Sequence, residues 1–371
     1  MKLIAEIGTS HAGSIETAIA LLDRVAEAGF DTAKFQWIYA DEILHPNTGD
    51  VDLPGGAIAL FDRFRELERD VEFYAALRDA CVDRDLEFLC TAFGPRSLAE
   101  LLSLEPTALK IASPELNYLQ LLSQAAASEV PIYASTGVST LADICEADAT
   151  IESARMRRDS KTGAAGVRSA GVVFLHCVTA YPTPEEEYNL DVIESLHRVT
   201  GRWWGVSDHT LDPIAVPIVA CAVGAVALEK HVTPDTAGAG LDDPVALPPE
   251  RFTETVSAVR ELETIEPSQR MSAVVERLGE ERVTAIRGDG VKRLAPSERG
   301  NYGRTNRSLH VCRPIRAGQR IESEALGILR TERRLRPGIH PRYADALAGA
   351  VAVRDIEDGA GIVWDDVIAR R

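Results

Sequence analysis

The sequence predicts an α/β protein, a (β/α)8 TIM barrel followed by a small β-rich domain. Eight short apolar runs alternate with helical patterns over residues 1–265, and residues 306–371 contain an internal repeat. Strands that alternate with helices pair in parallel, and eight such units close a barrel. Residues 266–305 are charged and irregular, which predicts a linker between the two domains.

The barrel strands are expected where β-branched and other apolar residues cluster. They lie near residues 3–8, 32–36, 87–93, 108–113, 131–136, 171–177, 203–208 and 226–232. The first helix spans Ser14 to Gly29, because Ser14 is a typical N-cap residue and glycine commonly ends a helix. Further helices are expected near 72–84, 96–104, 118–128, 140–157, 213–224 and 249–263. Residues 41–70 and 158–170 show no clear strand and are expected to be surface loops.

The repeat lies in residues 306–371, where Val311–Ile321 matches Ala352–Ile362 at a constant offset. The pairs are Arg313 with Arg354, Ile315 with Ile356, Gly318 with Gly359 and Ile321 with Ile362. Two similar hairpin-like units of this size predict a compact, pseudo-symmetric β-rich domain, which is too short to be a second enzyme.

Composition narrows the class of protein. The chain has 371 residues and a net charge of −17, which argues against a nucleic-acid partner or an anionic membrane surface. No apolar stretch is long enough to span a bilayer. The six cysteines form no C-x-x-C pair and indicate free, buried thiols in a reducing compartment. We therefore expect a cytoplasmic protein.

Polar residues end every predicted strand, at the face where barrel enzymes place their reactive groups. The residues that we single out here are Glu6, Lys34, Gln36, Thr91, Lys110, Ser113, Glu115, Ser135, Tyr181, Ser207, His209, Glu229 and His231. Lys34 and Lys110 are costly to bury unpaired. They indicate either structural ion pairs with Glu6 or Glu115, or an anion site in which lysines supply charge and hydroxyls supply donors.

His209 and His231 end neighbouring strands, the seventh and the eighth. Each is either a satisfied structural residue or a metal ligand, and the acidic Asp208 and Glu229 beside them favour a divalent ion. Imidazole suits manganese, zinc or iron, so the spacing alone does not choose among them. Glu6 and Glu115 are either general acid/base groups or partners of the lysines.

These residues, taken in order, resemble the sialic acid (N-acetylneuraminate) synthase family of phosphoenolpyruvate-dependent nonulosonic acid synthases. The blocks that carry the resemblance are Ala5–Ser14, Lys34–Gln36, Cys90–Phe93, Lys110–Ser113, Ser135–Gly137, His176–Pro182, Gly205–Thr210 and Glu229–His231. The C-terminal repeat is similar to the antifreeze-like (SAF, β-clip) domain that this family appends to its barrel.

The resemblance implies roles for these residues. His209 and His231 would bind manganese or a similar divalent ion. Phosphoenolpyruvate would be held by Lys34, Thr91, Lys110, Ser113, Ser135 and Ser207. Glu6, Glu115 and Asp242 would be catalytic, and Gln36, Tyr181 and Arg307 would contact an open-chain amino-sugar aldehyde. The products would be a 2-keto-3-deoxy sugar acid and phosphate. The resemblance also implies a domain-swapped homodimer in which the C-terminal domain covers the partner's active site.

The chain departs from the family pattern mainly around the sugar half of the site. Ser10 replaces an asparagine, Trp37 replaces a small hydroxyl residue, and Thr179 stands where serine or asparagine often helps to hold phosphate. Residues 239–241 lack the usual prolines. Two alternatives remain: a related synthase of the deoxyoctulosonate or deoxyheptulosonate type, and a non-catalytic carbohydrate-binding protein.

Overall fold

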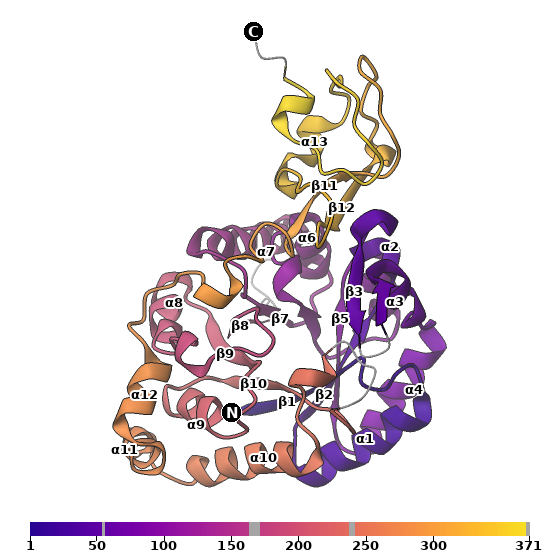
Figure 1. The fold of residues 1–371 in the computed structure, drawn as a ribbon. Helices are drawn as coiled ribbons and strands as arrows, with labels where there is room; N and C mark the ends of the chain where they lie inside the picture. Colours follow the sequence, from indigo (N-terminus) through magenta and orange to yellow (C-terminus); the bar gives the residue numbers. More distant parts are fainter. Residues whose placement is uncertain (54–55, 163–170, 237–241, 369–371) are drawn as a thin grey trace.

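The fold is a closed barrel of parallel strands with helices around it and a small domain on one side (Figure 1). The computed structural model describes residues 1–53, 56–162, 171–236 and 242–368. Around the barrel the strands run in the order β1, β10, β9, β8, β7, β6, β5 and β2. Their bounds are β1 (Lys2–Gly8), β2 (Thr32–Trp37), β5 (Glu87–Ala92), β6 (Leu109–Ile111), β7 (Ile132–Ser135), β8 (Val172–Cys177), β9 (Trp203–Asp208) and β10 (Ala227–His231). Each overlaps a predicted strand, so the predicted barrel is confirmed.

The two-residue period of the strands decides which side chains reach the barrel interior. On β10, Glu229 and His231 line the interior pocket, whereas Lys230 between them points the other way and binds Asp208 of β9 at 2.7 Å. Lys230 and Asp208 are both fully buried. Asp208 therefore stabilises the barrel wall and does not join the two histidines, contrary to what its place in the sequence suggested.

Most barrel helices also lie where the sequence predicted them. Their bounds are α1 (Ile15–Ala28), α4 (Val71–Val82), α5 (Pro95–Ser103), α6 (Leu119–Ala127), α7 (Leu141–Thr162), α8 (Val192–Thr200), α9 (Ala215–Ala222) and α10 (Pro249–Glu263). The Ser14 side chain accepts a hydrogen bond from Thr17 N, and Gly29 takes the left-handed conformation with φ 91°, so both predicted caps of α1 are confirmed. Helix α8 was not predicted from the sequence.

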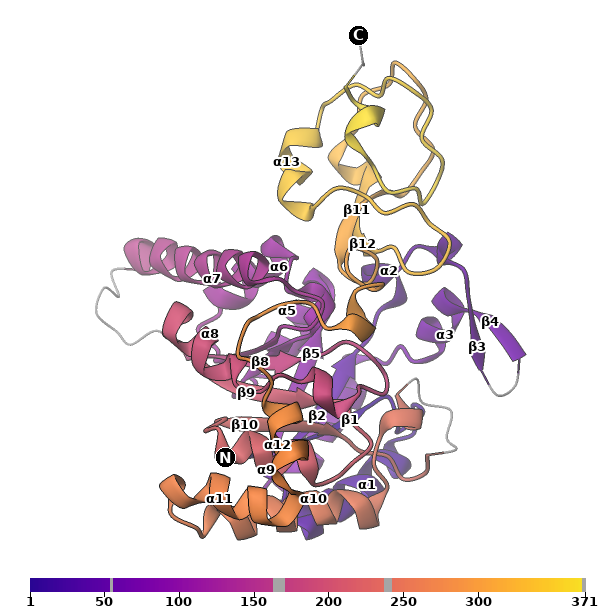
Figure 2. The same ribbon diagram turned by 60° about the vertical axis from the view of Figure 1, so that its left-hand side comes forward.

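The prediction that residues 41–70 contain no strand was wrong. This segment forms α2 (Ala40–Ile43), an antiparallel hairpin of β3 (Asp50–Leu53) and β4 (Gly56–Ala59), and α3 (Leu60–Glu66). The hairpin projects from the side of the barrel (Figure 2). It pairs with no barrel strand, so the alternation of the barrel gives no signal for it. In the other predicted loop, α7 continues to Thr162, and residues 163–170 lie outside the described residues.

Residues 266–305 are also more regular than predicted. They contain α11 (Pro267–Leu278) and α12 (Glu280–Arg287), which continue the helical layer beside α9 and α10 (Figure 1). Both helices are mostly polar, with Val274, Val283 and Ile286 as their buried residues, so their helical period is weak in the sequence. Residues 288–306, hereafter the connecting segment, hold one 3-10 turn and lead to the small domain.

The C-terminal domain has its own small core, which includes Leu309, Val311, Ile321 and Ile362. It is built from β11 (Arg307–Val311), β12 (Leu326–Arg330), α13 (Ala344–Leu347) and irregular segments. The predicted pseudo-symmetry is confirmed. Ile315 and Ile356 donate backbone hydrogen bonds to each other at 2.9 and 2.8 Å, and Gly318 and Gly359 share a left-handed φ of 84° and 82°.

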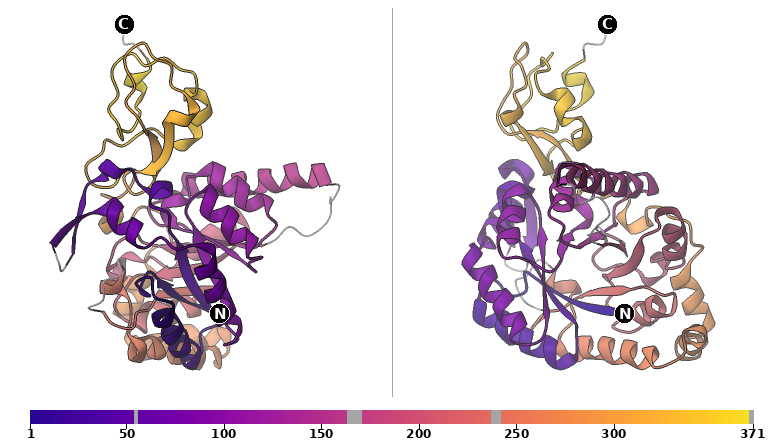
Figure 3. Two further views of the ribbon diagram at one scale, coloured as in Figure 1. Left: turned by 90° about the vertical axis from the view of Figure 1, so that its right-hand side faces the viewer. Right: turned by 180° about the vertical axis from the view of Figure 1, so that it is seen from behind.

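The C-terminal domain projects from one side of the barrel of its own chain, next to α2, α6 and α7 (Figure 3). Asn117 of the barrel donates to the carbonyl of Arg307 at 2.8 Å and accepts from its backbone N–H at 3.1 Å. Arg342 adds an ion pair to Glu146 of α7 at 2.6 Å. The domain-swapped homodimer stays a prediction. None of the described helices combines the length and apolarity that a bilayer crossing requires.

Candidate active site

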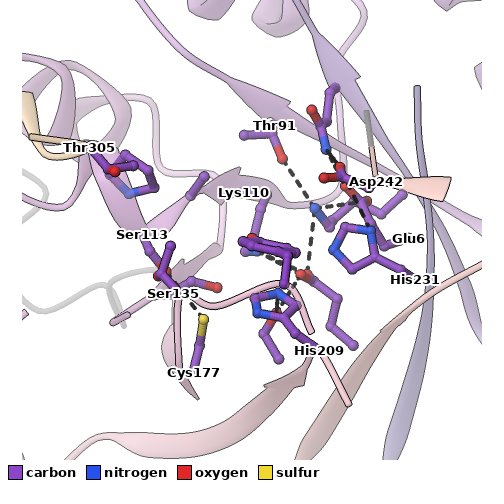
Figure 4. A pocket seen from close by; sticks show the side chains of 18 of the residues that line it. Glu6, Thr91, Lys110, Ser113, Ser135, Cys177, His209, His231, Asp242 and Thr305 are labelled. Carbon is purple, nitrogen blue, oxygen red and sulfur yellow. Dashed lines mark hydrogen bonds and ion pairs between the residues drawn. The ribbon is translucent and has the colours of Figure 1, made fainter. Parts of the chain in front are cut away.

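A pocket of about 190 Å³ lies at the carboxyl ends of the barrel strands, beneath the C-terminal domain. Of the predicted site residues, those that line it are Glu6, Lys34, Gln36, Thr91, Lys110, Ser113, Ser135, Tyr181, Ser207, His209, His231 and Asp242. They come from all eight barrel strands or the loops that follow them, and their side chains converge (Figure 4). Glu115 and Arg307 are the two predicted residues that do not line this pocket.

Two buried lysines share one buried carboxylate at the base of the pocket. Glu229 Oε2 lies 2.9 Å from Lys110 Nζ and 3.6 Å from Lys34 Nζ, and Lys34 also lies 2.8 Å from Glu6. Burial alone would lower the pKa of Lys34, but Glu229 and Glu6 outweigh it and raise that pKa to about 12. Burial opposes ionisation of Glu229, but Lys110 and Lys34 hold its pKa well below the ordinary value. The ion pairs expected from the sequence therefore exist, with Glu229 in place of Glu115.

Hydroxyl groups surround these lysines. Thr91 Oγ1 accepts from Lys34 Nζ at 3.3 Å, and Ser207 Oγ donates to Glu229 at 2.9 Å. Ser135 Oγ and Thr179 Oγ1 are buried and have no hydrogen-bond partner among the described residues. A buried hydroxyl without a partner is costly. These two groups are therefore available to a ligand, and donors beside lysines suit an anion.

Gly137 allows three of the lining residues to lie close together. A Cβ atom at this position would stand 2.2 Å from Thr179 Oγ1 and 3.0 Å from both Cys177 Sγ and Ser113 Oγ. The Gly137 N–H donates to Ser113 Oγ at 3.0 Å. The absence of a side chain at Gly137 is therefore a condition for the packing of the hydroxyl groups.

His209 and His231 lie side by side, with ring centroids 5.3 Å apart. Burial, together with the neighbouring His231, lowers the pKa of His209 to about 3, so this imidazole is neutral. Its Nδ1 donates to the Val178 carbonyl at 2.8 Å, so Nε2, which lies 3.5 Å from Ser207 Oγ, carries the lone pair that could bind a metal. Two adjacent imidazoles suit a divalent transition metal. Among the described residues no group of three His, Cys, Asp or Glu could ligate together, so such an ion would keep open positions.

A chain of polar side chains runs from the histidines to the other wall. Asp242 Oδ2 lies 3.8 Å from His231 Nδ1 and accepts from Gln36 Nε2 at 3.4 Å. The same Gln36 amide donates to Glu6 at 2.7 Å. Glu6 and Asp242 therefore lie on either side of one amide, close to both the lysines and the histidines. This arrangement can exchange protons with a ligand that binds between them.

The remaining two predicted residues form a buried contact between the domains. Arg307 and Glu115 are both completely buried, and Arg307 Nε donates to Glu115 at 2.9 Å. Glu115 also accepts from Arg330 of β12 at 2.8 and 2.9 Å. Arg330, and not Arg307, is the C-terminal arginine that lines the pocket. Arg307 holds Glu115, and Glu115 in turn holds Arg330.

The other lining residues were given no binding or catalytic role from the sequence. They are Phe64, Phe93, Ala112, Pro114, Cys177, Thr179, Glu229, Thr305 and Arg330. Glu229 was singled out beside the histidines, and the structure shows that it pairs with Lys34 and Lys110. Arg330 carries no local signal, since it reaches the pocket from another domain.

Trp37 does not shape the sugar half of the site, contrary to the expectation from the sequence. Its side chain is completely buried and stacks on Tyr74 with ring centroids 4.0 Å apart, away from the residues that line the pocket. The departure at residues 239–241 lies outside the described residues.

Two buried lysines, unpartnered hydroxyls and two histidines at the carboxyl ends of the strands define a barrel-enzyme type of site that suits an anionic ligand. Residues 21–270 match the NeuB family, and residues 306–368 match the SAF domain. The chain therefore belongs to the NeuB family, a family of sialic-acid-type synthases.

Named relatives extend over almost the whole chain. The spore coat polysaccharide biosynthesis protein SpsE of Bacillus subtilis is 32% identical, over 99% of this chain and 94% of its own. Its crystal structure covers all of this chain and 96% of its own, with a TM-score of 0.80. The N,N'-diacetyllegionaminic acid synthase of Legionella pneumophila is 26% identical over 99% of this chain and 94% of its own. A pseudaminic acid synthase of Campylobacter jejuni is 28% identical over 98% and 96%.

Replacing Glu115 tests the contact between the domains. The substitution Glu115→Gln removes the charge that Arg307 and Arg330 share, and breaking a buried ion pair in this way costs roughly 3 kcal/mol. We expect faster hydrogen exchange of the β11 and β12 amides, measured by mass spectrometry. The matched control is Glu146→Gln, which removes an exposed pair across the same interface and should cost less than about 1 kcal/mol. Equal exchange in the two variants would contradict this assignment.

Proposed function

We propose that this protein condenses phosphoenolpyruvate with an open-chain amino-sugar aldehyde, giving a nonulosonic-type 2-keto-3-deoxy acid and phosphate. One observation carries the proposal. Lys34 and Lys110 line the same pocket as the hydroxyls of Ser135 and Thr179, which have no partner among the described residues. His209 and His231 line this pocket as well. The names of the relatives, which include legionaminic and pseudaminic acid synthases, support the same type of product.

In this proposal the phosphate and carboxylate of phosphoenolpyruvate lie on the side of the two lysines. Lys110 and Lys34 supply charge, and Ser135 and Thr179 supply hydroxyl donors that have no partner among the described residues. A charged hydrogen bond contributes roughly 1.5–3 kcal/mol, so a few of them suffice for tight binding. Thr91, Ser113 and Ser207 complete the polar wall.

The sugar aldehyde would bind on the side of Asp242 and Arg330. A bond forms between C3 of phosphoenolpyruvate and the aldehyde carbon, and the aldehyde oxygen takes up a proton. Water then adds to C2 and loses one proton, which leaves a C2 hydroxyl. The bond between C2 and the phosphate oxygen breaks as this hydroxyl becomes the ketone, and its proton leaves with the phosphate. Glu6 and Asp242, linked through Gln36, are placed to give the first proton and to accept the second.

His209 and His231 would hold a divalent ion, for which we propose manganese. When bound, it would supply Lewis-acid polarisation of the aldehyde oxygen. The charges of the described pocket residues indicate that a multiply charged anion would require an additional cation. Three of them are acidic (Glu6, Glu229 and Asp242) and three are basic (Lys34, Lys110 and Arg330), so they balance one another and leave no net charge to meet a multiply charged anion.

The decisive test of the proposal is phosphate release from phosphoenolpyruvate with manganese present, across a panel of aldehydes. We expect release with 2-acetamido or 2,4-diacetamido hexoses, and less with N-acetylmannosamine than with the diacetamido sugars. Release only with arabinose 5-phosphate or erythrose 4-phosphate would instead indicate a synthase of the deoxyoctulosonate or deoxyheptulosonate type. The proposal fails if no aldehyde of the panel releases phosphate.

Metal binding is tested by His209→Ala and His231→Ala. Each removes one of two imidazole ligands, and we expect each variant to lose bound manganese, measured by electron paramagnetic resonance, while the barrel stays folded. The control is His197→Ala, since His197 is exposed and lies outside the pocket. Stoichiometric manganese binding in both pocket variants would show that the metal, if any, is held elsewhere.

The anion site is tested by Lys110→Met. Losing one charged hydrogen bond should weaken phosphoenolpyruvate binding by at least about 10-fold in a calorimetric titration, with little change in the KM of the sugar. The substitution also leaves Glu229 short of a cation, so the double variant Lys110→Met/Glu229→Gln serves as control. We expect the double variant to regain stability but not affinity. Unchanged phosphoenolpyruvate affinity in Lys110→Met would place the anion site elsewhere.

A further inference from the structure

Glu298 is a buried carboxylate in the connecting segment, outside the pocket. Its side chain is 1% exposed, and its oxygens accept three backbone N–H groups: those of Val138 at 2.8 Å, Thr179 at 2.9 Å and Ala295 at 3.1 Å. No salt bridge to Glu298 occurs in the described part of the chain, although Lys292 of the same segment lies close enough for Glu298 to oppose the lowering of the Lys292 pKa by burial. A buried charge of this kind is costly unless its hydrogen bonds are made. These hydrogen bonds therefore fix the positions of the two loops that carry Val138 and Thr179.

Two asparagines of the connecting segment donate hydrogen bonds to the backbone carbonyls of the same two residues. Asn306 Nδ2 donates to the Val138 carbonyl at 2.9 Å, and Asn301 Nδ2 donates to the Thr179 carbonyl at 3.0 Å. Side chains of the connecting segment thus form hydrogen bonds with both the N–H and the C=O of Val138 and of Thr179. These loops follow β7 and β8, and their backbone is fixed by side chains that lie far along the chain.

Both held residues belong to the hydroxyl wall of the pocket. Thr179 carries one of the unpartnered hydroxyls. Val138 directly follows Gly137, whose N–H donates to Ser113 Oγ. Val138 has φ 42°, a conformation that a β-branched residue rarely adopts, so bonds from outside the loop are needed to keep it there.

We propose that Glu298 is a positioning residue for the phosphoenolpyruvate subsite. It acts through the backbone of Val138 and Thr179 and does not itself line the pocket. This inference rests on the proposed function, because it takes phosphoenolpyruvate as the anion. It adds that affinity for this anion depends on a segment outside the barrel strands.

The test is Glu298→Gln in the full-length protein. An amide has one acceptor oxygen, and its NH2 group would face at least one of the three N–H donors. We expect phosphoenolpyruvate, titrated without sugar, to bind about 10-fold more weakly or worse, while the KM of the sugar changes by less than about twofold. The matched control is Glu187→Gln. Glu187 accepts from Ser297 of the same turn at 2.9 and 2.6 Å, and none of its hydrogen bonds within the described part of the chain is to Val138 or Thr179.

A second variant, Asn301→Ala, removes one contact from a half-exposed position and decides the matter if Glu298→Gln does not fold. We expect it to weaken phosphoenolpyruvate binding severalfold, again with the sugar KM unchanged. Wild-type affinity in the folded variants, or an equal loss in Glu187→Gln, would overturn the inference. If the wild-type protein itself binds no phosphoenolpyruvate, the proposed function fails, and the inference falls with it.

Discussion

The structure depends on how positive charge is buried at the carboxyl end of the barrel. Lys34 and Lys110 stand on interior strands where water does not compensate them, and a lysine in such a place is costly. Glu229 meets this cost by lying between them, and Glu6 adds a second partner to Lys34. The resulting group is neutral and fixed in place. It can bind an anion without moving, since the donors already point into the pocket.

A carboxylate that binds two cations also occurs at the contact between the two domains. Glu115 is shared by Arg307 and Arg330, as Glu229 is shared by the two lysines. In each case one carboxylate binds two cations. Both lysines bound by Glu229 line the pocket, whereas of the two arginines bound by Glu115 only Arg330 does. The C-terminal domain is therefore bound to the barrel by the chemistry that also shapes the site. Glu115 therefore contributes both to the contact between the domains and to the position of Arg330.

The sequence predicted the strands, most pocket residues and the C-terminal repeat, because each depends on a short stretch of chain. Short apolar, β-branched runs placed the strands, and strand ends placed most pocket residues, because a barrel brings all its strand ends to one face. The repeat predicted a pseudo-symmetric domain, in which the equivalent residues Ile315 and Ile356 bond each other. What failed depends on contacts between distant segments. Trp37 follows Gln36 on one strand but faces Tyr74 in the core, and Arg330 reaches the pocket only through the packing of two domains.

The path of the connecting segment has a consequence for the order in which the protein matures. The barrel core includes buried residues as late as Ile286 of α12, whereas the partners of the loops after β7 and β8 come later, between Glu298 and Asn306. Domains generally fold from the N-terminus as they leave the ribosome. The residues of the barrel core therefore leave the ribosome before the side chains that bond the loops after β7 and β8. A chain that ends in this interval contains the whole core but lacks the partners that fix these two walls of the pocket.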